Sequence, residues 1–179
     1  LVVGRLVNQK GLDFLIQVFS RSHQKFSDWQ LIILGKGEEE GRLNQIIKEN
    51  QLENQVKLMG EVSDTHLWYD KASLFMLTSH YEGTPNSALE AMAWGIPLLA
   101  TDTCGGLADL LTHKVDGFIV NRTEDSVLEA MSWIHENPKQ TALIGVAGRK
   151  SIERFDKRLV ADSWLALIGG DRVNGKSDG

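Results

Sequence analysis

The sequence contains little cysteine and no long apolar run. Its one cysteine, Cys104, stands alone among 179 residues, so no disulfide can form within the chain. A reducing compartment is therefore the expected setting, and we predict a cytoplasmic location. No stretch of about 18 consecutive apolar residues occurs, so no segment has the character of a membrane-spanning helix. The most apolar stretch, residues 91–100, is interrupted by Gly95 and Pro97.

Basic residues are also in the minority. The chain has 19 Lys and Arg against 24 Asp and Glu, which gives a net charge of −5. Nucleic-acid binding requires a basic face, so nucleic acid is not an expected partner. A single nucleotide needs only a few local cations and remains compatible with this charge. The five histidines show no metal-ligand spacing, and we expect no bound metal.

An initiator methionine is missing as well. The chain begins with Leu1, Val2 and Val3, which have the pattern of the second half of a strand without a start signal before it. We therefore expect a domain taken from a longer protein. The hydrophobic content of 42% is sufficient for the core of one domain of this length.

Short apolar runs alternate with helical patterns along the chain. The runs cover residues 1–3, 30–34, 55–59, 74–77, 97–101 and 117–120. They are mostly continuous rather than alternating, which is typical of strands buried on both faces. Apolar residues between the runs recur at helical spacing, for example from Leu12 to Phe19 and, after a capping Thr123, from Val127 to Ile134. This alternation predicts an α/β fold: a Rossmann-like, doubly wound parallel sheet of about six strands with flanking helices.

The pattern becomes purely helical from Pro138. We expect one helix over residues 140–154 and another over 159–168, with Trp164 on its apolar face. Residues 169–179 are polar and rich in glycine, which predicts a flexible tail. One domain should therefore span residues 1–168.

Ligands of open α/β sheets bind beyond the carboxyl ends of the strands. Arg5 and Lys10 follow the first strand, and Gly60 and Glu61 follow the third. Cations fixed at such an edge stabilise a departing diphosphate more in the transition state than before it. The alternative is that Arg5 and Lys10 are ordinary surface charges beside a turn.

The most informative segment is EGTPNSALE, which runs from Glu82 to Glu90 after the fourth strand. Pro85 favours a turn or a first helical turn, so Glu82 should precede a helix that contains Glu90. The helix N-terminus offers free N–H groups and a positive dipole end to an anion. Because the neighbours of Glu90 are mostly apolar, we expect a buried helix and a partner for this carboxylate, such as ribose hydroxyls. The alternative is a solvent-facing helix glutamate.

Other residues near this edge are expected to be structural. Ala91, Met92 and Trp94 are expected in the core rather than in the site, and Cys104 is expected to be a structural or incidental thiol. His80 follows the fourth strand and is a weaker candidate for the site.

These residues together resemble the C-terminal, donor-binding domain of retaining glycosyltransferases with the GT-B fold, in the glycosyl transferases group 1 (GT4) family. Three landmarks carry the resemblance: Gly4-Arg5-Leu6 with Lys10-Gly11, then Leu34-Gly35-Lys36-Gly37, and the E-x7-E motif from Glu82 to Glu90. Residues 56–60 also fit the family's strand before the base-binding loop. Thr84 departs from the family, which often has Phe there.

The resemblance implies transfer of a sugar with retention from a UDP- or GDP-linked donor, without metal, to a glycan or lipid-linked acceptor. Arg5 and Lys10 would bind the diphosphate, Glu82 the transferred sugar, and Glu90 the ribose. The base would lie near Gly60 and Glu61. Backbone amides near Asn86, Ser87 and Ala88, at the start of the helix, would help to hold phosphate. Gly83, in the loop before this helix, would also belong to the donor site.

The acceptor would bind to a preceding domain. Any contact with the inner face of the membrane would also be made by that domain. This lobe alone should bind donor but catalyse poorly or not at all. The family's common use suggests cell-surface polysaccharide or lipopolysaccharide biosynthesis.

Three alternatives stay open at this point. The chain could belong to a GT-B enzyme of the glycogen synthase or sugar-phosphate synthase type. It could be a non-catalytic nucleotide-binding module derived from such a lobe, although Arg5, Lys10, Glu82 and Glu90 are all present. It could also be a doubly wound domain for another small ligand, which leaves the joint presence of these four residues unexplained.

Overall fold

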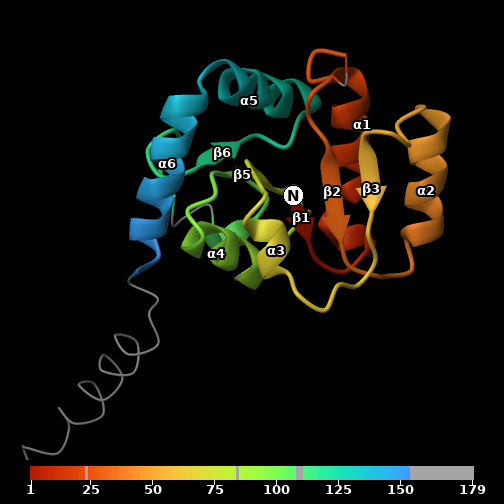
Figure 1. Ribbon diagram of the computed structural model, residues 1–179, viewed down its shortest axis with the longest axis horizontal. Coiled ribbons are helices and arrows are strands. Elements are labelled where there is room, and N and C mark those ends of the chain that lie inside the picture. The colour runs from red at the N-terminus through yellow and green to blue at the C-terminus, as the bar shows by residue number, and fades with distance from the viewer. Residues whose placement is uncertain (23, 84, 108–110, 154–179) are drawn as a thin grey trace, which may run out of the picture.

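The computed structural model describes residues 1–22, 24–83, 85–107 and 111–153, and its strands form two parallel sheets of three strands each (Figure 1). The first has the order β1-β2-β3 and the second β4-β5-β6. The six strands are β1 (Val2–Val3), β2 (Leu31–Leu34), β3 (Val56–Leu58), β4 (Phe75–Leu77), β5 (Leu98–Thr101) and β6 (Phe118–Val120). Each lies within a predicted apolar run, so the predicted number and position of the strands are confirmed.

The two sheets meet at the edges formed by β1 and β4. The amino group of Leu1 donates to the carbonyl oxygen of Leu74 at 2.8 Å, and the N–H of Met76 donates to the carbonyl oxygen of Leu1 at 2.9 Å. Two bonds from one residue to positions on either side of Phe75 are the pattern of a parallel pair. The strands thus follow the order β3-β2-β1-β4-β5-β6, which is that of a doubly wound α/β domain.

Helices flank both sheets (Figure 1). They are α1 (Leu12–Ser22), α2 (Glu40–Glu49), α3 (His66–Tyr69), α4 (Asn86–Ala93), α5 (Glu124–Glu136) and α6 (Pro138–Ser151), with short 3₁₀ turns η1 (Asn8–Lys10) and η2 (Gly105–Leu107). The predicted cap of α5 is confirmed, because the hydroxyl of Thr123 accepts from the N–H of Ser126. Helix α6 begins two residues before the predicted start, since Pro138 fits the first turn of a helix.

The core consists of two clusters of buried side chains. One packs α1, α2 and α5 against strands of both sheets around Ile16, Ile33 and Met131. The other packs α4 against the second sheet around Phe75 and Leu98. Residues of β4 and β5 are buried throughout, as expected for strands covered on both faces.

Some predictions concern residues outside the described part of the chain. These are the final residue of the predicted helix over 140–154, the helix over 159–168 with Trp164, and the tail over 169–179. Within the described ranges, none of the helices combines the length and apolarity needed to cross a bilayer.

Candidate functional site

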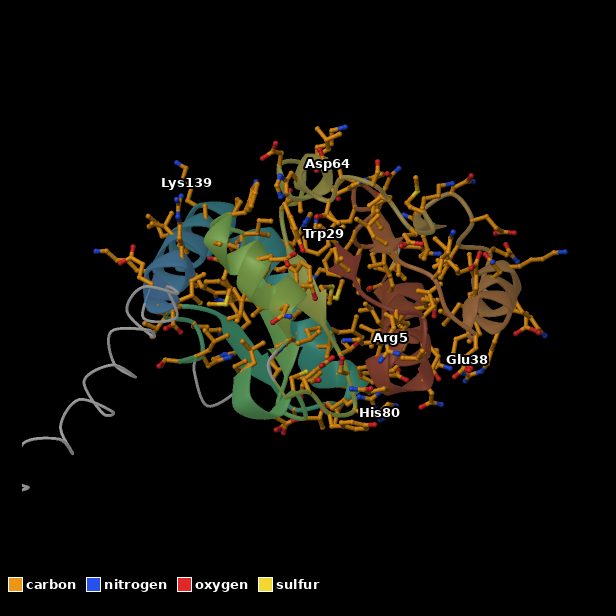
Figure 2. All side chains as sticks on the ribbon, turned by 90° about the horizontal axis from the view of Figure 1, so that it is seen from below. Arg5, Trp29, Glu38, Asp64, His80 and Lys139 are labelled. Carbon is orange, nitrogen blue, oxygen red and sulfur yellow. The ribbon has the colours of Figure 1, made fainter. Side chains whose placement is uncertain are left out.

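The charged residues predicted for the site gather at the carboxyl edge of the strands. Arg5 follows β1, and His80 follows β4. Figure 2 labels both in the lower half of the view, whereas Trp29 precedes β2 and so belongs to the amino end of that strand. The fold therefore brings the ends of separate strands to one surface, as the parallel topology predicts.

Lys10 and Glu82 are in direct contact, although 72 positions separate them in the sequence. The ammonium nitrogen of Lys10 lies 2.5 Å from Oε1 of Glu82, and the hydroxyl of Ser79 donates to the same oxygen at 2.7 Å. Ser79 is fully buried, and the side chains of Lys10 and Glu82 are 17% and 9% exposed. Charge-assisted hydrogen bonds of this kind are strong and directional. They hold one oxygen of Glu82, whereas Oε2 has no hydrogen-bond or ion-pair partner among the residues that the structure describes.

Backbone contacts between the two loops bring this pair together. The N–H of His80 donates to the carbonyl oxygen of Gln9 at 2.8 Å, and the hydroxyl of Thr78 donates to that of Gly11 at 3.2 Å. The loop after β1 is thus attached to the end of β4 on both sides of Lys10. The position of Lys10 is fixed by main-chain bonds rather than by its flexible side chain alone.

Two glycines allow neighbouring loops to pack closely against the segments that lead to Lys10 and Glu82. Gly35 has φ +136°, and a Cβ there would lie 1.9 Å from the carbonyl oxygen of Gly4, beside which the Lys10 side chain runs. Gly105 has φ +49°, and its Cβ would lie 2.5 Å from the carbonyl oxygen of Glu82. Only glycine adopts these conformations without strain and leaves room for the neighbouring backbone.

The N-terminus of α4 presents free donors at the same edge. Pro85 precedes the helix in an extended conformation and supplies no side-chain cap. The N–H groups of Asn86 and Ser87 have no acceptor within the described part of the chain, which is the arrangement that binds anions. The N–H of Ala88, also predicted to help hold phosphate, donates to the carbonyl oxygen of Pro85 at 3.0 Å.

Glu90 lies one turn further along α4 and has a protein partner. The hydroxyl of Tyr69 donates to Oε2 of Glu90 at 2.9 Å. Burial, reinforced by this carboxylate, raises the pKa of Tyr69, so the phenol stays protonated and donates at all ordinary pH values. The prediction that the helix is buried around Glu90 is wrong, because the residue is exposed. Helix α4 covers the sheet with Ala88 and Met92 and leaves the opposite face in solvent.

Trp94 likewise differs from its prediction as a core residue. It is 40% exposed, and its indole N–H donates to Oδ1 of Asp70 at 2.7 Å. Ala91 and Met92 are buried, as predicted.

The remaining predicted residues line the surface around this centre. Arg5 is exposed, and its side chain has no hydrogen-bond or ion-pair partner among the residues described, so it is available to an anion. Glu61 lies 3.8 Å from Lys36 in an exposed pair of little energetic weight. Gly60 has φ +70° and accepts from the N–H of Gly35 at 2.7 Å, which joins the loop after β3 to the same edge.

Arg122 is a residue of this edge that the sequence analysis did not select. Its Nε donates to the carbonyl oxygen of Thr78 at 3.2 Å, and its guanidinium lies 4.4 Å from the ring centroid of Phe14. Arg122 therefore supports the end of β4, from which the Glu82 loop departs. Its position two residues after the sixth strand was the signal that could have identified it.

Cys104 is expected to be unreactive in the folded protein. It is fully buried, and burial raises the pKa of its thiol, so little thiolate forms near neutral pH. Labelling with a chromogenic disulfide at pH 8 should be slow in buffer and fast in denaturant. Native labelling as fast as that of the unfolded chain would contradict the buried position below the Glu82 loop.

The two cavities described for this structure do not coincide with the carboxyl edge of the strands. A cavity of about 1180 Å³ lies among Trp29, Trp68, Trp94 and Pro97, at the opposite end of the strands, and one of about 440 Å³ lies beside Trp133. Neither is lined by the residues of the carboxyl edge that carry charge. Among the residues described, no group of three His, Cys, Asp or Glu side chains is placed to hold a metal ion. We therefore assign the site from its chemistry rather than from its enclosed volume.

A doubly wound sheet with free helix donors, cations and two carboxylates at its carboxyl edge defines a nucleotide-binding type of α/β domain. Residues 1–151 match the model of the family described as glycosyl transferases group 1, and the chain belongs to this family. The resemblance drawn from the sequence is thereby confirmed.

Individual relatives agree with this assignment. The chain is 29% identical over 169 residues to an uncharacterized glycosyltransferase of Haemophilus influenzae, covering 94% of this chain and 48% of that protein. It is 31% identical over 130 residues to the amylovoran biosynthesis glycosyltransferase AmsD of Erwinia amylovora, covering 73% and 36%. The chain thus spans half or less of these relatives.

A solved structure has the same fold. The HepE protein of Anabaena, crystallised in complex with UDP, superposes with a TM-score of 0.84 at 25% identity, over 94% of this chain and 48% of that one. The α/β fold and its relation to GT-B glycosyltransferase lobes are therefore shown.

Proposed function

We propose that this chain is the donor-binding lobe of a retaining glycosyltransferase, which uses a UDP- or GDP-linked sugar and a glycan or lipid-linked acceptor. The observation that carries the proposal is the Lys10–Glu82 pair at the carboxyl edge, next in sequence to the free N-terminus of α4. This arrangement places positive charge, directed N–H groups and a half-occupied carboxylate on one surface.

The diphosphate would bind at the N-terminus of α4. The N–H groups of Asn86 and Ser87 offer two directed donors, and the exposed Arg5 offers a planar guanidinium. Lys10 uses one of its three N–H donors on Glu82 and keeps the others for phosphate oxygens. As the bond to the sugar breaks, charge accumulates on the diphosphate, and these fixed donors stabilise it without a metal ion.

The nucleoside and the sugar would extend in two directions from the diphosphate. Glu90 has Oε1 free for ribose hydroxyls, and the loop with Gly60 and Glu61 would contact the base. Oε2 of Glu82 would accept from a hydroxyl of the transferred sugar and so orient it beneath the acceptor. The acceptor would attack from the face that the diphosphate leaves, which gives retention.

The biological role of the whole protein and its donor nucleotide are also part of the proposal, and they are inferred from relatives. A relative named for amylovoran biosynthesis supports a role in cell-surface polysaccharide assembly, and a related structure with UDP supports a uridine donor. Because the chain spans half or less of its relatives, acceptor binding and any membrane contact would belong to other parts of the protein. The single buried cysteine suits a cytoplasmic reaction.

Calorimetric titration with UDP, GDP and ADP tests the proposal. One nucleotide should bind saturably, and Glu90→Ala should weaken it about tenfold or more, as expected for loss of charged hydrogen bonds to ribose. Glu129→Ala, which removes an exposed glutamate of α5, is the matched control and should leave the affinity unchanged. Equal affinity in the original chain and in Glu90→Ala would refute the ribose role.

A further inference from the structure

The carboxylate of Glu90 is held on an exposed surface by a single buried hydroxyl. Ordering a glutamate side chain costs a considerable amount of rotamer entropy. A binding site that relies on an exposed glutamate must meet this cost when the ligand arrives, unless the side chain is already oriented. In this structure the 2.9 Å bond from Tyr69 to Oε2 supplies that orientation.

Tyr69 is itself rigidly placed. Its side chain is 1% exposed and belongs to the core cluster around the second sheet. Its ring lies 6.2 Å from that of Phe75 and 5.6 Å from that of Trp94, measured between centroids. Trp94 is in turn fixed by its bond to Asp70. The phenol therefore presents its hydroxyl to α4 from a position that packing determines.

The hydroxyl has one proton and two potential acceptors. The carbonyl oxygen of Ser87 lies at 3.4 Å, and Oε2 of Glu90 lies at 2.9 Å. The shorter contact to the charged acceptor is the hydrogen bond, and the longer one lies near the limit for such contacts. Proton donation is therefore committed to Glu90.

We infer that Tyr69 is a positioning residue that fixes Glu90 for recognition of ribose and so gives the site its preference for ribonucleotides over deoxyribonucleotides. The inference rests on the proposed function. Tyr69 is buried and would not itself contact the ligand; it would act by leaving Oε1 and the second lone pair of Oε2 of Glu90 aimed at the two ribose hydroxyls. With those hydroxyls absent from the ligand, the bond from Tyr69 contributes nothing to binding.

The test compares Tyr69→Phe with the unmodified chain. Phenylalanine keeps the ring in its packing environment and removes only the hydroxyl. Dissociation constants are measured for UDP or GDP, whichever binds more tightly, and for its 2′,3′-dideoxy counterpart. The dissociation constant of the dideoxynucleotide divided by that of the ribonucleotide should fall by about three- to tenfold in Tyr69→Phe. The fall should come from weaker binding of the ribonucleotide alone, and its size is that expected for the net contribution of one hydrogen bond.

Two controls separate positioning from a structural effect. Tyr81→Phe makes the same change at a tyrosine that is 65% exposed beside Glu82, and it should leave the ratio unchanged. In a Glu90→Gln background, Tyr69→Phe should cause little further loss, because the two residues act as a unit.

The outcomes distinguish the inference from the function on which it rests. Equal weakening of ribonucleotide and dideoxynucleotide binding in Tyr69→Phe, or an unchanged ratio, would overturn the positioning role and leave the donor site intact. Failure of the unmodified chain to bind any nucleoside diphosphate would overturn the proposed function, and the positioning role with it.

Discussion

Glu82→Gln is expected to lower the rate of sugar transfer by the whole protein about 100-fold or more, in the range found when one preorganised polar group is removed from an active site. The substitution keeps the size of the side chain and removes its charge, so the ammonium of Lys10 loses the partner that fixes it at 2.5 Å. The group proposed to orient the transferred sugar also becomes a weaker acceptor. Steady-state kinetics with the donor sugar and its acceptor measure the effect.

The same substitution should change nucleoside diphosphate affinity by less than about threefold, because in the proposed site the diphosphate would be held mainly by Arg5 and the N–H groups of α4. Glu129→Gln, on the exposed face of α5, is the control for loss of one negative charge and should transfer sugar at the normal rate. An unchanged rate in Glu82→Gln, or a loss of affinity as large as the loss of rate, would contradict the separate role given to Glu82.

Gly35→Ala is expected to destabilise the fold by about 3 kcal/mol or more, as strained backbone and overpacking together produce. The added methyl group would meet the carbonyl oxygen of Gly4 at 1.9 Å, and φ +136° is unsuitable for alanine. Because the clash is with backbone, β1 and the loop that carries Lys10 must shift. For a chain of this size, 3 kcal/mol corresponds to a decrease in melting temperature of about 6–12 °C.

Gly41→Ala provides the matched control within the same part of the chain. Gly41 lies in α2, and a Cβ there would have no neighbouring atom within 4 Å. Alanine is favoured over glycine inside a helix by about 0.5–1 kcal/mol, so this variant should melt at the same or a slightly higher temperature. Equal melting temperatures for both variants would show that the contact between Gly35 and Gly4 does not constrain the fold.

The strands could be predicted from the sequence because parallel strands covered on both faces appear as continuous apolar runs. Each of β1 to β6 lies inside a predicted run, and the alternation with helices was enough to predict the doubly wound arrangement. Helix α3 was missed, since His66–Tyr69 is too short to show a helical period.

The burial of α4 could not be predicted from composition alone. Alanine occurs on both its covered and its open face, and only the packing of β4, β5 and α6 decides which face is buried. The neighbours of Glu90 along the chain therefore suggested a buried carboxylate, whereas the fold exposes it. Its protein partner Tyr69 was not predicted, because it lies 21 positions away in the sequence, and the ribose hydroxyls named for Glu90 stay a prediction.

The position of the site was predictable and its internal contacts were not. Strand topology brings Arg5, Lys10 and the Glu82 loop to one edge whatever the side chains do. The bonds from Lys10 and Ser79 to one oxygen of Glu82, and the support of Thr78 by Arg122, depend on how far side chains reach between loops. Such contacts between distant segments leave no periodic signal in the sequence.

A crystal structure of the chain with the nucleoside diphosphate that it binds most tightly would test the proposed donor site directly. We expect the diphosphate at the N–H groups of Asn86 and Ser87, within reach of Arg5 and Lys10, and the ribose on Glu90. A nucleotide bound instead among Trp29, Trp68 and Trp94, at the opposite end of the strands, would contradict the proposal.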